Sequence, residues 1–432
     1  MGRPETIGVV GLWHLGSVVA ASWAELGHRV VGIDRAARVV AQLGSGRAPI
    51  FEPELDSLIK ANIDRGRLSF TSDLRVVADA DVLFIAFDTP VDGEDRLELA
   101  ELDATIHGAA PHLKDGAVVV VSSQVPVGTC DRWRRELRRD RGRAAVELVY
   151  SPENLRLGEA LGCYLHPDRI VIGAEDAVAL ERVRTLFTPM KAPFVTMSLA
   201  SAEMAKHAVN SFLATSVSFI NEVATLCELT GADVLSVGEA LKSDPRIGPR
   251  AFLAAGLGFA GGTLARDIQV LREAGRTGRV VTPLLEIVLD VNRRRTTLVA
   301  QRLLDRYGKL TGLGVGVLGL TYKAGTSTLR RSVALEVIET LCGAGAMVRA
   351  FDPKADLTEL DGPAGFEVVV DAYEAARGAS ALVILTEWPE FAWLDFDRIR
   401  ALMAEPVIID GKNLLASLRL GERGFTYSGI GR

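Results

Sequence analysis

Cysteine and histidine are scarce in this chain, which limits the chemistry that it can hold. Its 432 residues include four cysteines and six histidines. The cysteines lie far apart without a Cys-x-x-Cys pair, and the histidines show no metal-binding spacing such as His-x-x-x-His. We therefore expect no metal site, no structural disulfide and a thiol-reduced, cytoplasmic protein. The cysteines are Cys130, Cys163, Cys227 and Cys342.

Charge blocks and long apolar runs are also missing. The net charge is −6 without a basic block or tail, which argues against nucleic acid or an anionic membrane as a partner. We expect no membrane span, and the N-terminus enters a strand-like run without a signal-peptide pattern. Hydrophobic residues make up 48% of the chain, enough for large cores, and its length suggests two or three domains.

The N-terminal segment has the order of a dinucleotide-binding unit. An apolar run at Thr6–Val10 is followed by GLWHLG, a helix-like stretch, and a second strand at residues 28–33 that ends in Asp34. In a Rossmann βαβ unit this acid binds the ribose hydroxyls. We predict NAD as the cofactor, and Arg35 leaves NADP open. The residues expected to contact the cofactor here are Gly11, Trp13, His14, Leu15, Gly16, Asp34 and Arg35.

The glycine motif is incomplete, and the strands that follow add further candidates. Trp13 stands where the middle glycine of Gly-x-Gly-x-x-Gly lets the backbone approach the pyrophosphate. A βαβ unit that binds no dinucleotide is therefore an alternative for this stretch taken alone. Three later apolar runs end at turns that carry Thr89, Gln124 and Glu153. Ligands bind beyond the carboxyl ends of parallel strands, although each residue alone is also compatible with an ordinary turn.

The middle segment is predicted to be helical. A long helix is expected from Ser198 or Ser201 to Thr230. Lys206 and Asn210 lie four residues apart and therefore share one face of it. The helix is apolar on most sides, as in a helix buried between domains or subunits, where a lysine needs a partner or a task. A lysine that extends to solvent is the alternative.

A glycine-rich stretch, GLGFAGGTLARD, occupies residues 256–267. Four of its first seven residues are glycine, which lets backbone approach a ligand closely. Asp267 lies four residues beyond Thr263, so a helix starting near Thr263 would place both on one face. The basic triplet at residues 293–295 is expected to lie on a solvated face.

The last segment partly repeats the first. GLGVGVLGL at 312–320 and GAGAMVRAFDP at 343–353 form a second strand–turn–helix–strand–acid unit. The loop at 321–332 carries Lys323, Arg330 and Arg331, which suit a phosphate-bearing ligand. We predict an α/β fold with two Rossmann-like doubly wound domains joined by a central helical domain with a long helix. The expected boundaries are 1–196, 197–300 and 311–432.

In their order along nearly the whole chain, these stretches resemble the UDP-glucose/GDP-mannose dehydrogenase family. The resemblance implies NAD-dependent oxidation of a nucleotide-linked sugar, a C-terminal domain that binds the nucleotide diphosphate, and a homodimer built on the long central helix. The matching stretches are DTP at 88–90, SQVPVGT at 123–129, SPENLRLGEA at 151–160, AKHAVNSFLATSVSFINE at 205–222, DPRIG at 244–248, GLGFAGGTLARD at 256–267, GLTYKAGT at 319–326, TEWPEF at 386–391 and YSGIGR at 427–432.

The resemblance also implies roles for single residues. Lys206, Asn210 and Asp267 match the family's catalytic residues, which can transfer the proton and stabilise an alkoxide. Glu153 matches the glutamate beside the substrate and its water. Thr263 completes the implied catalytic set. The implied cofactor contacts add Thr89, Gln124 and Arg330. The implied substrate contacts are Glu153, Leu155, Arg156, Lys206, Asn210, Arg246, Gly258, Phe259, Gly262 and Lys323.

The main departure from the family falls on its nucleophile. Thr263 stands where the family has a cysteine that traps the aldehyde and forms a thioester on the way to the acid. A threonine hydroxyl is a far poorer nucleophile, so we predict a two-electron oxidation to an aldehyde or ketone, or its reverse. A four-electron oxidation without a thioester and a non-catalytic nucleotide-binding homologue are the alternatives. The other departures are Trp13, Gln124, Asn154, Leu264, Arg266, Ser327, Thr328 and Lys412.

Overall fold

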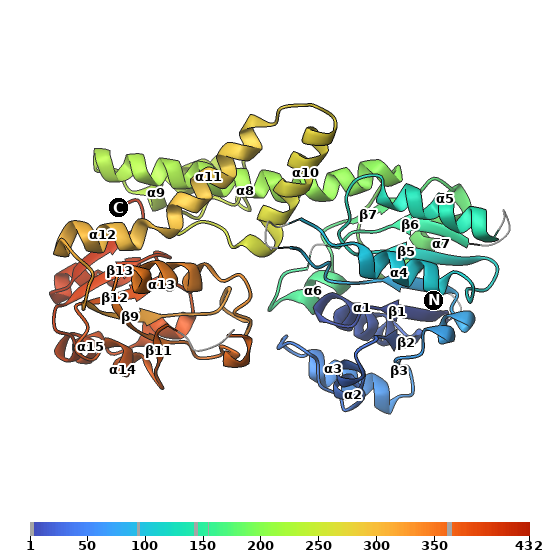
Figure 1. Ribbon diagram of the computed structural model, residues 1–432, viewed down its shortest axis with the longest axis horizontal. Coiled ribbons are helices and arrows are strands. Elements are labelled where there is room, and N and C mark those ends of the chain that lie inside the picture. Colours follow the sequence, from blue (N-terminus) through green and yellow to red (C-terminus); the bar gives the residue numbers. More distant parts are fainter. Residues whose placement is uncertain (1–3, 93–95, 142–145, 154, 361–364) are drawn as a thin grey trace. The chain divides into compact units, whose positions relative to one another are not determined.

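The computed structural model of the chain describes residues 4–92, 96–141, 146–153, 155–360 and 365–432, so that Asn154 lies outside the described residues. The chain forms two compact units, Met1–Ala208 and Val209–Arg432, and the division falls inside the long helix α8 (Leu199–Thr230). Each unit contains one mostly parallel sheet with helices on both faces (Figure 1). The predicted fold class is thus confirmed, whereas the three-domain boundaries stay a prediction.

The N-terminal unit is built on an eight-stranded sheet. Its order is β3-β2-β1-β4-β5-β6-β7-β8, and only the pair β6–β7 is antiparallel. The order 3-2-1-4-5-6 is that of a doubly wound dinucleotide-binding sheet. The strands are β1 (Thr6–Val10), β2 (Arg29–Ile33), β3 (Leu68–Thr71), β4 (Val82–Ile85), β5 (Ala117–Val121), β6 (Val146–Tyr150), β7 (Ile170–Gly173) and β8 (Phe194–Met197).

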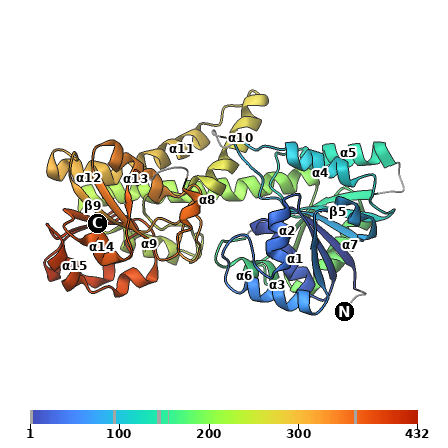
Figure 2. The same cartoon turned by 60° about the horizontal axis from the view of Figure 1, so that its bottom comes forward.

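Two apolar clusters fill opposite faces of this sheet. Successive residues of β5 alternate between them, as the two-residue period of a strand requires: Val118 and Val120 belong to one, Val119 and Val121 to the other. Helices α1, α3, α6 and α7 pack on the first face, and α4 and α5 on the second (Figure 2). The helices of this unit are α1 (His14–Glu25), α2 (Ala37–Gly44), α3 (Leu55–Asp64), α4 (Ala100–Ala109), α5 (Thr129–Arg141), α6 (Ala160–Leu165) and α7 (Ala177–Phe187).

The second unit contains a six-stranded, all-parallel sheet in the order β11-β10-β9-β12-β13-β14. Helices α12 (Leu298–Tyr307) and α13 (Val333–Gly343) cover one face, and α14 (Ala372–Ala376) and α15 (Phe396–Leu402) the other (Figure 1). This is again the order 3-2-1-4-5-6, so the repeat in the sequence is a structural repeat. The strands are β9 (Gly314–Leu318), β10 (Met347–Phe351), β11 (Glu367–Val368), β12 (Ala381–Ile384), β13 (Val407–Asp410) and β14 (Thr426–Gly429).

The two sheets share one local arrangement at their first turn. Gly11 after β1 has a φ of +88°, and Gly319 after β9 has a φ of +99°, a backbone region that favours glycine. The carboxylate of Asp34 accepts the N–H that follows Gly11, and that of Asp352 accepts the N–H that follows Gly319, each at 2.8 Å. The acid at the end of the second strand therefore fixes the glycine turn in both units.

The helix α8 connects the two sheets, and the second unit adds α9 (Val234–Ser243), α10 (Arg266–Thr277) and α11 (Pro283–Thr296). The Ser198 hydroxyl accepts the N–H of Ser201 at 3.2 Å near the start of α8, and Gly231, with a φ of +75°, follows its last residue. These contacts confirm the predicted long helix and both of its end signals.

Contrary to expectation, α8 is long and apolar enough to cross a membrane by length and composition alone. Buried polar side chains of α8 have protein partners, however, in both units. His207 hydrogen-bonds the carbonyl oxygen of Val125 at 2.8 Å, and Asn221 accepts the N–H of Gly256 at 2.9 Å. Such bonds are those of a helix packed against protein, because lipid offers no hydrogen-bonding groups in their place.

Candidate active site

The turn between β1 and α1 fits a dinucleotide. A Cβ at Gly11 would lie 2.8 Å from the Phe87 ring, and a Cβ at Gly16 would overlap the carbonyl oxygen of Gly11. Both positions therefore require glycine, as close packing in a dinucleotide turn does. Each carboxylate oxygen of Asp34 accepts one backbone N–H and keeps lone pairs for ribose hydroxyls. Arg35 is exposed beside it.

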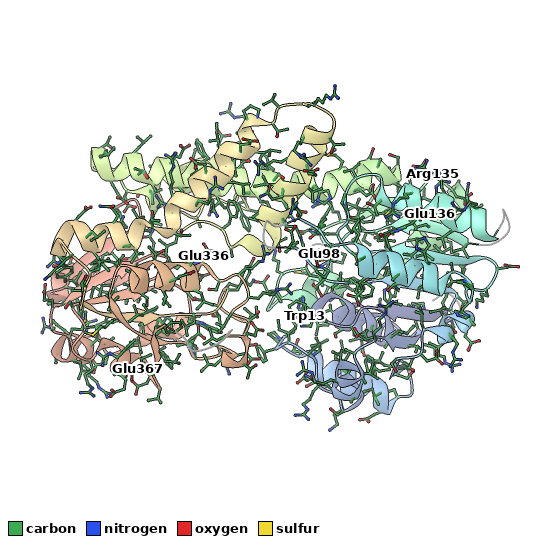
Figure 3. The ribbon with its side chains drawn as sticks, in the orientation of Figure 1. Trp13, Glu98, Arg135, Glu136, Glu336 and Glu367 are labelled. Atoms are coloured by element: carbon green, nitrogen blue, oxygen red, sulfur yellow. The ribbon has the colours of Figure 1, made fainter. Side chains whose placement is uncertain are left out.

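Two residues make the N-terminus of α1 differ from an ordinary dinucleotide-binding turn: Trp13, which precedes the helix, and Asp88, which contacts it. Trp13 is the residue that precedes the helix, and it is partly exposed (Figure 3). Asp88, which follows β4, accepts the N–H of Leu15 at 3.0 Å. Its carboxylate thus lies at the positive end of the helix, where the pyrophosphate binds in this fold. Trp13 therefore adds bulk to the turn, and Asp88 adds negative charge, which a turn made of glycines would lack.

His14 and Glu52 form a buried pair at the same helix start, with Nε2 and Oε2 2.9 Å apart. Burial lowers the pKa of His14, but the hydrogen bond to Glu52 and the Asp88 carboxylate outweigh it and raise this pKa. Burial raises the pKa of Glu52, but bonds from His14 and from the N–H groups of Ala160 and Gly158 outweigh it and lower this pKa. Sequence reasoning missed Glu52, because an isolated glutamate between two elements follows no motif.

The loop after β6 is bonded to helix α8. Lys206 is buried and donates from Nζ to the carbonyl oxygen of Glu153. The Glu153 carboxylate accepts the N–H of Leu155, whose side chain packs against the core of the unit. The structure therefore brings together two of the predicted catalytic residues, Lys206 and Glu153. Arg156 lies at the surface, 3.7 Å from the carboxylate of Glu159.

The loop after β5 is fixed by a second buried residue of α8. Glu203 accepts the N–H groups of Gly128 and Cys130, the latter at 2.7 Å, and burial raises the pKa of Glu203. Thr89 donates from Oγ1 to the carbonyl oxygen of Gln124 at 2.8 Å, and both side chains are buried. The predicted contacts Thr89 and Gln124 thus lie together. Glu203 was missed, because a single glutamate in a helix usually faces solvent.

Asn210 and Asp267 meet in the second unit. The side-chain amide of Asn210, on α8, donates to Oδ2 of Asp267, on α10, and both residues are buried. Lys206 stands one helical turn before Asn210 on α8. The three residues predicted to be catalytic therefore lie on two helices, and the Asn210–Asp267 contact is direct.

Thr263 lies in a π-helical turn, Gly261–Ala265, that leads directly into α10. Such turns are rare and occur frequently at functional sites. The predicted helix start near Thr263 is confirmed, but the wider turn alters its spacing to Asp267 from that of a regular α-helix. The Tyr322 phenol lies beside the Thr263 side chain, and burial raises the pKa of Tyr322 although the charge of Arg266 opposes this. Gly262, a predicted substrate contact, lies in the same turn.

The glycine loop, residues 256–262, is held by helix α11. Asn292 accepts the N–H of Phe259 at 2.8 Å and donates to its carbonyl oxygen at 2.9 Å. The Phe259 side chain is buried in a small cluster with Ala214 and Ile268, so it fixes the loop to the helices. Gly258 has a φ of +95°, and a Cβ there would overlap Oδ1 of Asn292.

Arg295 corrects the expectation that the triplet 293–295 faces solvent. Arg293 and Arg294 are exposed and pair with Asp290, but Arg295 is only 7% exposed. Its Nε donates to the carbonyl oxygen of Gly256 at 3.1 Å. Successive helical residues turn by about 100°, so adjacent arginines face different surroundings.

The predicted phosphate-binding side of the second unit carries an ion pair. Lys323 and Arg330 lie on the loop between β9 and α13. Lys412 pairs with Glu387 at 2.9 Å. Burial raises the pKa of Glu387, but the charges of Lys412 and Lys323 outweigh it and lower this pKa. This end of the sheet therefore combines several basic groups with the partly exposed carboxylate of Glu387.

Arg246, predicted to contact the substrate, is exposed and pairs with Asp244, two residues earlier, at 2.7 Å. Oδ1 of Asp244 also accepts the backbone N–H of Arg246 at 2.9 Å and its Nε at 3.0 Å, which makes a local surface turn. Within the second unit Arg246 is therefore not brought to the glycine loop by any contact that the structure describes.

Three sequence profiles of one family match successive parts of the chain. The NAD-binding domain of the UDP-glucose/GDP-mannose dehydrogenase family matches residues 5–191, its central domain 200–294 and its UDP-binding domain 316–417. The chain belongs to this family. Membership confirms the resemblance, and the NAD-binding domain confirms NAD as the cofactor of an oxidoreductase that acts on a CH–OH group. The roles of single residues stay predictions.

Individual members of the UDP-glucose/GDP-mannose dehydrogenase family match over almost their whole length. The UDP-glucose 6-dehydrogenase of Rhizobium meliloti is 38% identical over 434 residues, covering 99% of both chains. A UDP-glucose 6-dehydrogenase of Bacillus subtilis is 35% identical, covering 99% of this chain and 93% of the relative. The solved UDP-glucose dehydrogenase of Pyrobaculum islandicum has a TM-score of 0.90 at 32% identity, covering 99% of this chain and 98% of the other. For the UDP-D-ManNAc dehydrogenase of Pyrococcus horikoshii the TM-score is 0.88 at 28% identity, covering 99% of each chain.

Proposed function

We propose that the chain catalyses a two-electron, NAD-dependent oxidation of a UDP-linked sugar, with an aldehyde or ketone as product. The substrate class follows from the UDP-binding domain and from relatives named UDP-glucose 6-dehydrogenase. The reaction type rests on one observation, the surroundings of Thr263.

Among the described residues, the group beside Thr263 is not suited to activate its hydroxyl. The Tyr322 phenol lies beside this hydroxyl, and burial raises its pKa. A phenol with a raised pKa stays protonated at neutral pH and does not remove a proton from threonine. A nucleophile without an adjacent base or a lowered pKa is weak, which disfavours a covalent intermediate on Thr263.

The remaining groups are sufficient for a single oxidation. NAD, when bound, accepts the hydride from the sugar carbon. We assign the Asp267 carboxylate as the proton acceptor and the Asn210 amide as the group that fixes its orientation. The Lys206 ammonium, one turn earlier on α8, is assigned to stabilise negative charge on the sugar oxygen. Glu153 is assigned to orient Lys206 through its carbonyl oxygen.

A second candidate is a four-electron oxidation to the acid without a thioester. The names of the relatives favour it, since several matches over nearly the full length are UDP-glucose 6-dehydrogenases. In this case the aldehyde leaves the first step free, adds water and is oxidised again as its hydrate. Thr263 then needs no nucleophilic role in either step.

Product analysis separates the two candidates. The purified protein is supplied with NAD and a panel of UDP-sugars, and NADH is counted against products identified by mass spectrometry. One NADH per sugar with an aldehyde or ketone supports the proposal. Two NADH with a uronic acid would refute it in favour of the four-electron reaction.

A Thr263→Cys variant adds an internal comparison, with Thr263→Ser as its control. A thiol at this position restores the family's nucleophile, so we expect acid product from the cysteine variant only. Acid from the serine variant as well would show that the hydroxyl itself is competent, contrary to the proposal.

A further inference from the structure

We propose that Asn292 and Arg295, here called the α11 pair, are positioning residues that hold the glycine loop in the geometry required for turnover. The inference rests on the proposed function, because it takes the loop as part of the substrate site. In the contacts that the structure describes, neither residue bonds the groups assigned to proton transfer. Both act through the backbone of residues 256–259.

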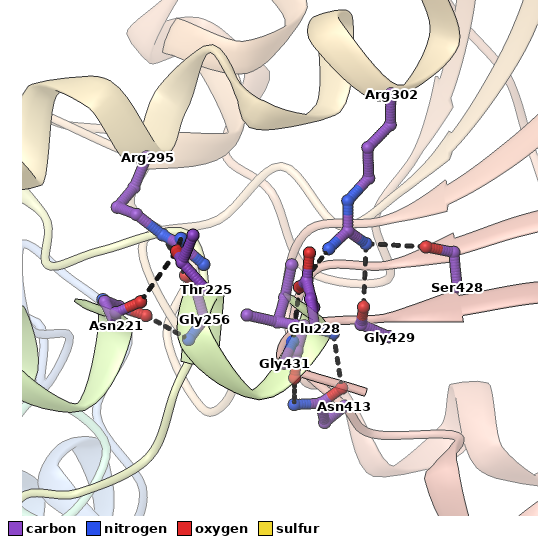
Figure 4. A network of polar contacts seen from close by, with 11 residues as sticks. Asn221, Thr225, Glu228, Gly256, Arg295, Arg302, Asn413, Ser428, Gly429 and Gly431 are labelled. Carbon is purple, nitrogen blue, oxygen red and sulfur yellow. Dashed lines mark hydrogen bonds and ion pairs between the residues drawn. The ribbon is translucent and has the colours of Figure 1, made fainter. Parts of the chain in front are cut away.

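The pair bonds the backbone of the loop at two points. Asn292 both accepts from and donates to Phe259, with N···O distances of 2.8 and 2.9 Å. Arg295 donates to the carbonyl oxygen of Gly256 at 3.1 Å, while Asn221 of α8 accepts the N–H of the same glycine at 2.9 Å (Figure 4). Gly256 and Phe259 therefore each have both backbone polar groups bonded, which fixes the orientation as well as the position of the backbone.

Close contacts prevent the backbone of the glycine loop from moving nearer to helix α11. Gly258 lies between the two anchored residues, and a Cβ there would overlap Oδ1 of Asn292 and lie 3.5 Å from Cβ of Arg295. A Cβ at Gly256 would lie 3.2 Å from the carbonyl oxygen of Gly411 on its other side. Glycine at position 258 therefore lets the loop backbone pack directly against α11, and the Asn292 and Arg295 side chains determine its position.

Arg295 is poorly explained as a residue that serves stability alone. It is 7% exposed, and burial lowers its pKa to about 10, so it stays charged at neutral pH. Its Nη2 is buried without a hydrogen-bond partner among the described residues. A buried, incompletely bonded guanidinium costs free energy that an apolar side chain of similar size avoids. The arginine is therefore better explained by the loop contact that it makes.

Further hydrogen bonds, more distant from the site, fix the helix that bears the α11 pair. Nη1 of Arg295 lies 3.3 Å from the Thr225 hydroxyl on α8. Two turns further, on α12, Arg302 bonds Glu228 at 2.6 Å, and the Ser428 hydroxyl at 2.7 Å (Figure 4). These bonds fix α11 and α12 to α8 and to the last strand of the sheet. Because α11 is itself fixed by these bonds, Asn292 and Arg295 can position the loop to within a fraction of an ångström.

The loop also leads directly to the groups assigned to the reaction. Phe259 lies four residues before Thr263, and the π-helical turn Gly261–Ala265 continues into α10, which carries Asp267. A shift of the loop would therefore move this turn as well. Misplacement of reacting groups by about 1 Å lowers turnover by about a hundredfold.

The test compares Arg295→Met with Arg294→Met. Methionine keeps the length and removes the charge and the donors at both positions, but Arg294 is exposed and pairs with Asp290. We expect Arg295→Met to unfold at a temperature equal to or above that of the wild type, with kcat lowered about a hundredfold and KM changed little. Arg294→Met should behave like the wild type. Wild-type kcat in Arg295→Met would overturn the inference.

Hydrogen exchange provides a readout that does not depend on activity. The N–H groups of Gly256 and Phe259 are bonded to Asn221 and Asn292, and we expect faster exchange of both in Arg295→Met and in Asn292→Ala. Exchange at the wild-type rate in both variants would overturn the inference. If the wild type oxidises no UDP-sugar, the proposed function fails, while this measurement still decides whether the pair holds the loop. Asn292→Ala also replaces Arg295→Met should the latter not fold.

Discussion

Nε2 of His14 lies 2.9 Å from Oε2 of Glu52, and the same carboxylate accepts the N–H groups of Gly158 at 2.8 Å and Ala160 at 2.8 Å. The pair therefore connects the start of α1 with the loop after β6 that carries Glu153. The first of these segments is the dinucleotide turn, and the second contains a residue assigned to the reaction. One buried ion pair thus fixes two parts of the predicted site within the N-terminal unit.

This pair predicts a specific loss of stability at alkaline pH. The pKa of His14 is raised above its ordinary value of 6.5, so its stabilising charge is present below 6.5 and is lost as pH rises through the higher pKa of the folded state. We expect the difference in unfolding free energy between the wild type and His14→Gln to shrink above pH 6.5. Denaturant titrations from about pH 6 to pH 9 measure it.

His28 is a matched control of opposite sign. Burial lowers the pKa of His28, and its Nδ1 accepts the N–H of Glu5 at 3.2 Å. The neutral form is therefore the stabilising one, and its contribution is lost as pH falls. The difference between the wild type and His28→Gln should grow as pH rises to 6.5 and stay constant above it, so these titrations extend down to about pH 5. The same pH trend in both variants would contradict the assignment of a charged His14.

The carboxylate at the start of α1 predicts that NAD binding can be improved. Asp88 accepts the N–H of Leu15, where the negatively charged pyrophosphate binds in this fold. Repulsion between unit charges about 4 Å apart is worth about 1–4 kcal/mol near a surface. We expect Asp88→Asn to lower the dissociation constant of NAD about tenfold in calorimetry. Trp13→Gly should act in the same direction by restoring the missing glycine.

Asp73→Asn is the control for this experiment, because Asp73 is exposed and pairs with Arg75 at 2.8 Å outside the turn. It should leave the affinity for NAD unchanged. Weaker binding of NAD to Asp88→Asn would show the opposite relationship, in which the carboxylate is needed to organise the N-terminus of α1 for the cofactor.

Sequence patterns predicted the buried parts of both sheets well. β1 begins and ends at the predicted residues, and β4, β5 and β6 precede the turns predicted to follow apolar runs, because a strand covered on both faces is a continuous apolar run. The short edge strands were not predicted. β3 and β8 are only partly buried, so their sequences, LSFT and FVTM, carry too few apolar residues to be distinguished from loops.

The site was predicted where it follows family motifs and missed where it depends on tertiary contacts. Lys206, Asn210 and Asp267 were found through motifs, and the structure gives Asn210 and Asp267 a direct bond. Glu203 and Arg295 were missed, since both are charged residues that pattern rules assign to solvent. Their partners are backbone groups 73 residues away for Glu203 and 39 for Arg295, a relationship that a local pattern cannot contain.

Substitutions of Asp267 should change turnover and folding stability separately. Asp267→Asn keeps the size of the side chain and removes the proton acceptor, so we expect turnover to fall by about 10²–10⁴-fold while NAD still binds. The double variant Asn210→Asp with Asp267→Asn restores an amide–carboxylate bond with the charge on α8. We expect it to recover stability without recovering turnover. Recovery of turnover would show that the position of the charge is immaterial, contrary to the role assigned to Asp267.

The exposed face of α8 predicts how the chain assembles. Phe212, Phe219 and Leu226 recur every seven residues and are 71, 51 and 58% exposed. A seven-residue apolar repeat on one helix face packs against a second helix, and we propose that the second helix is α8 of another copy. Phe219→Glu should then lower the mass in solution from twice 46.3 kDa to 46.3 kDa. Light scattering coupled to gel filtration measures this mass.

Val178→Glu is the control, because Val178 on α7 is 78% exposed and lies outside the repeat. It introduces the same charge at a comparably exposed apolar position, and it should leave the larger mass unchanged. A wild-type mass of 46.3 kDa would contradict the proposal. A dimer would also explain the apolar composition of α8, because apolar side chains that are exposed in one copy would be covered by the other copy, without a membrane.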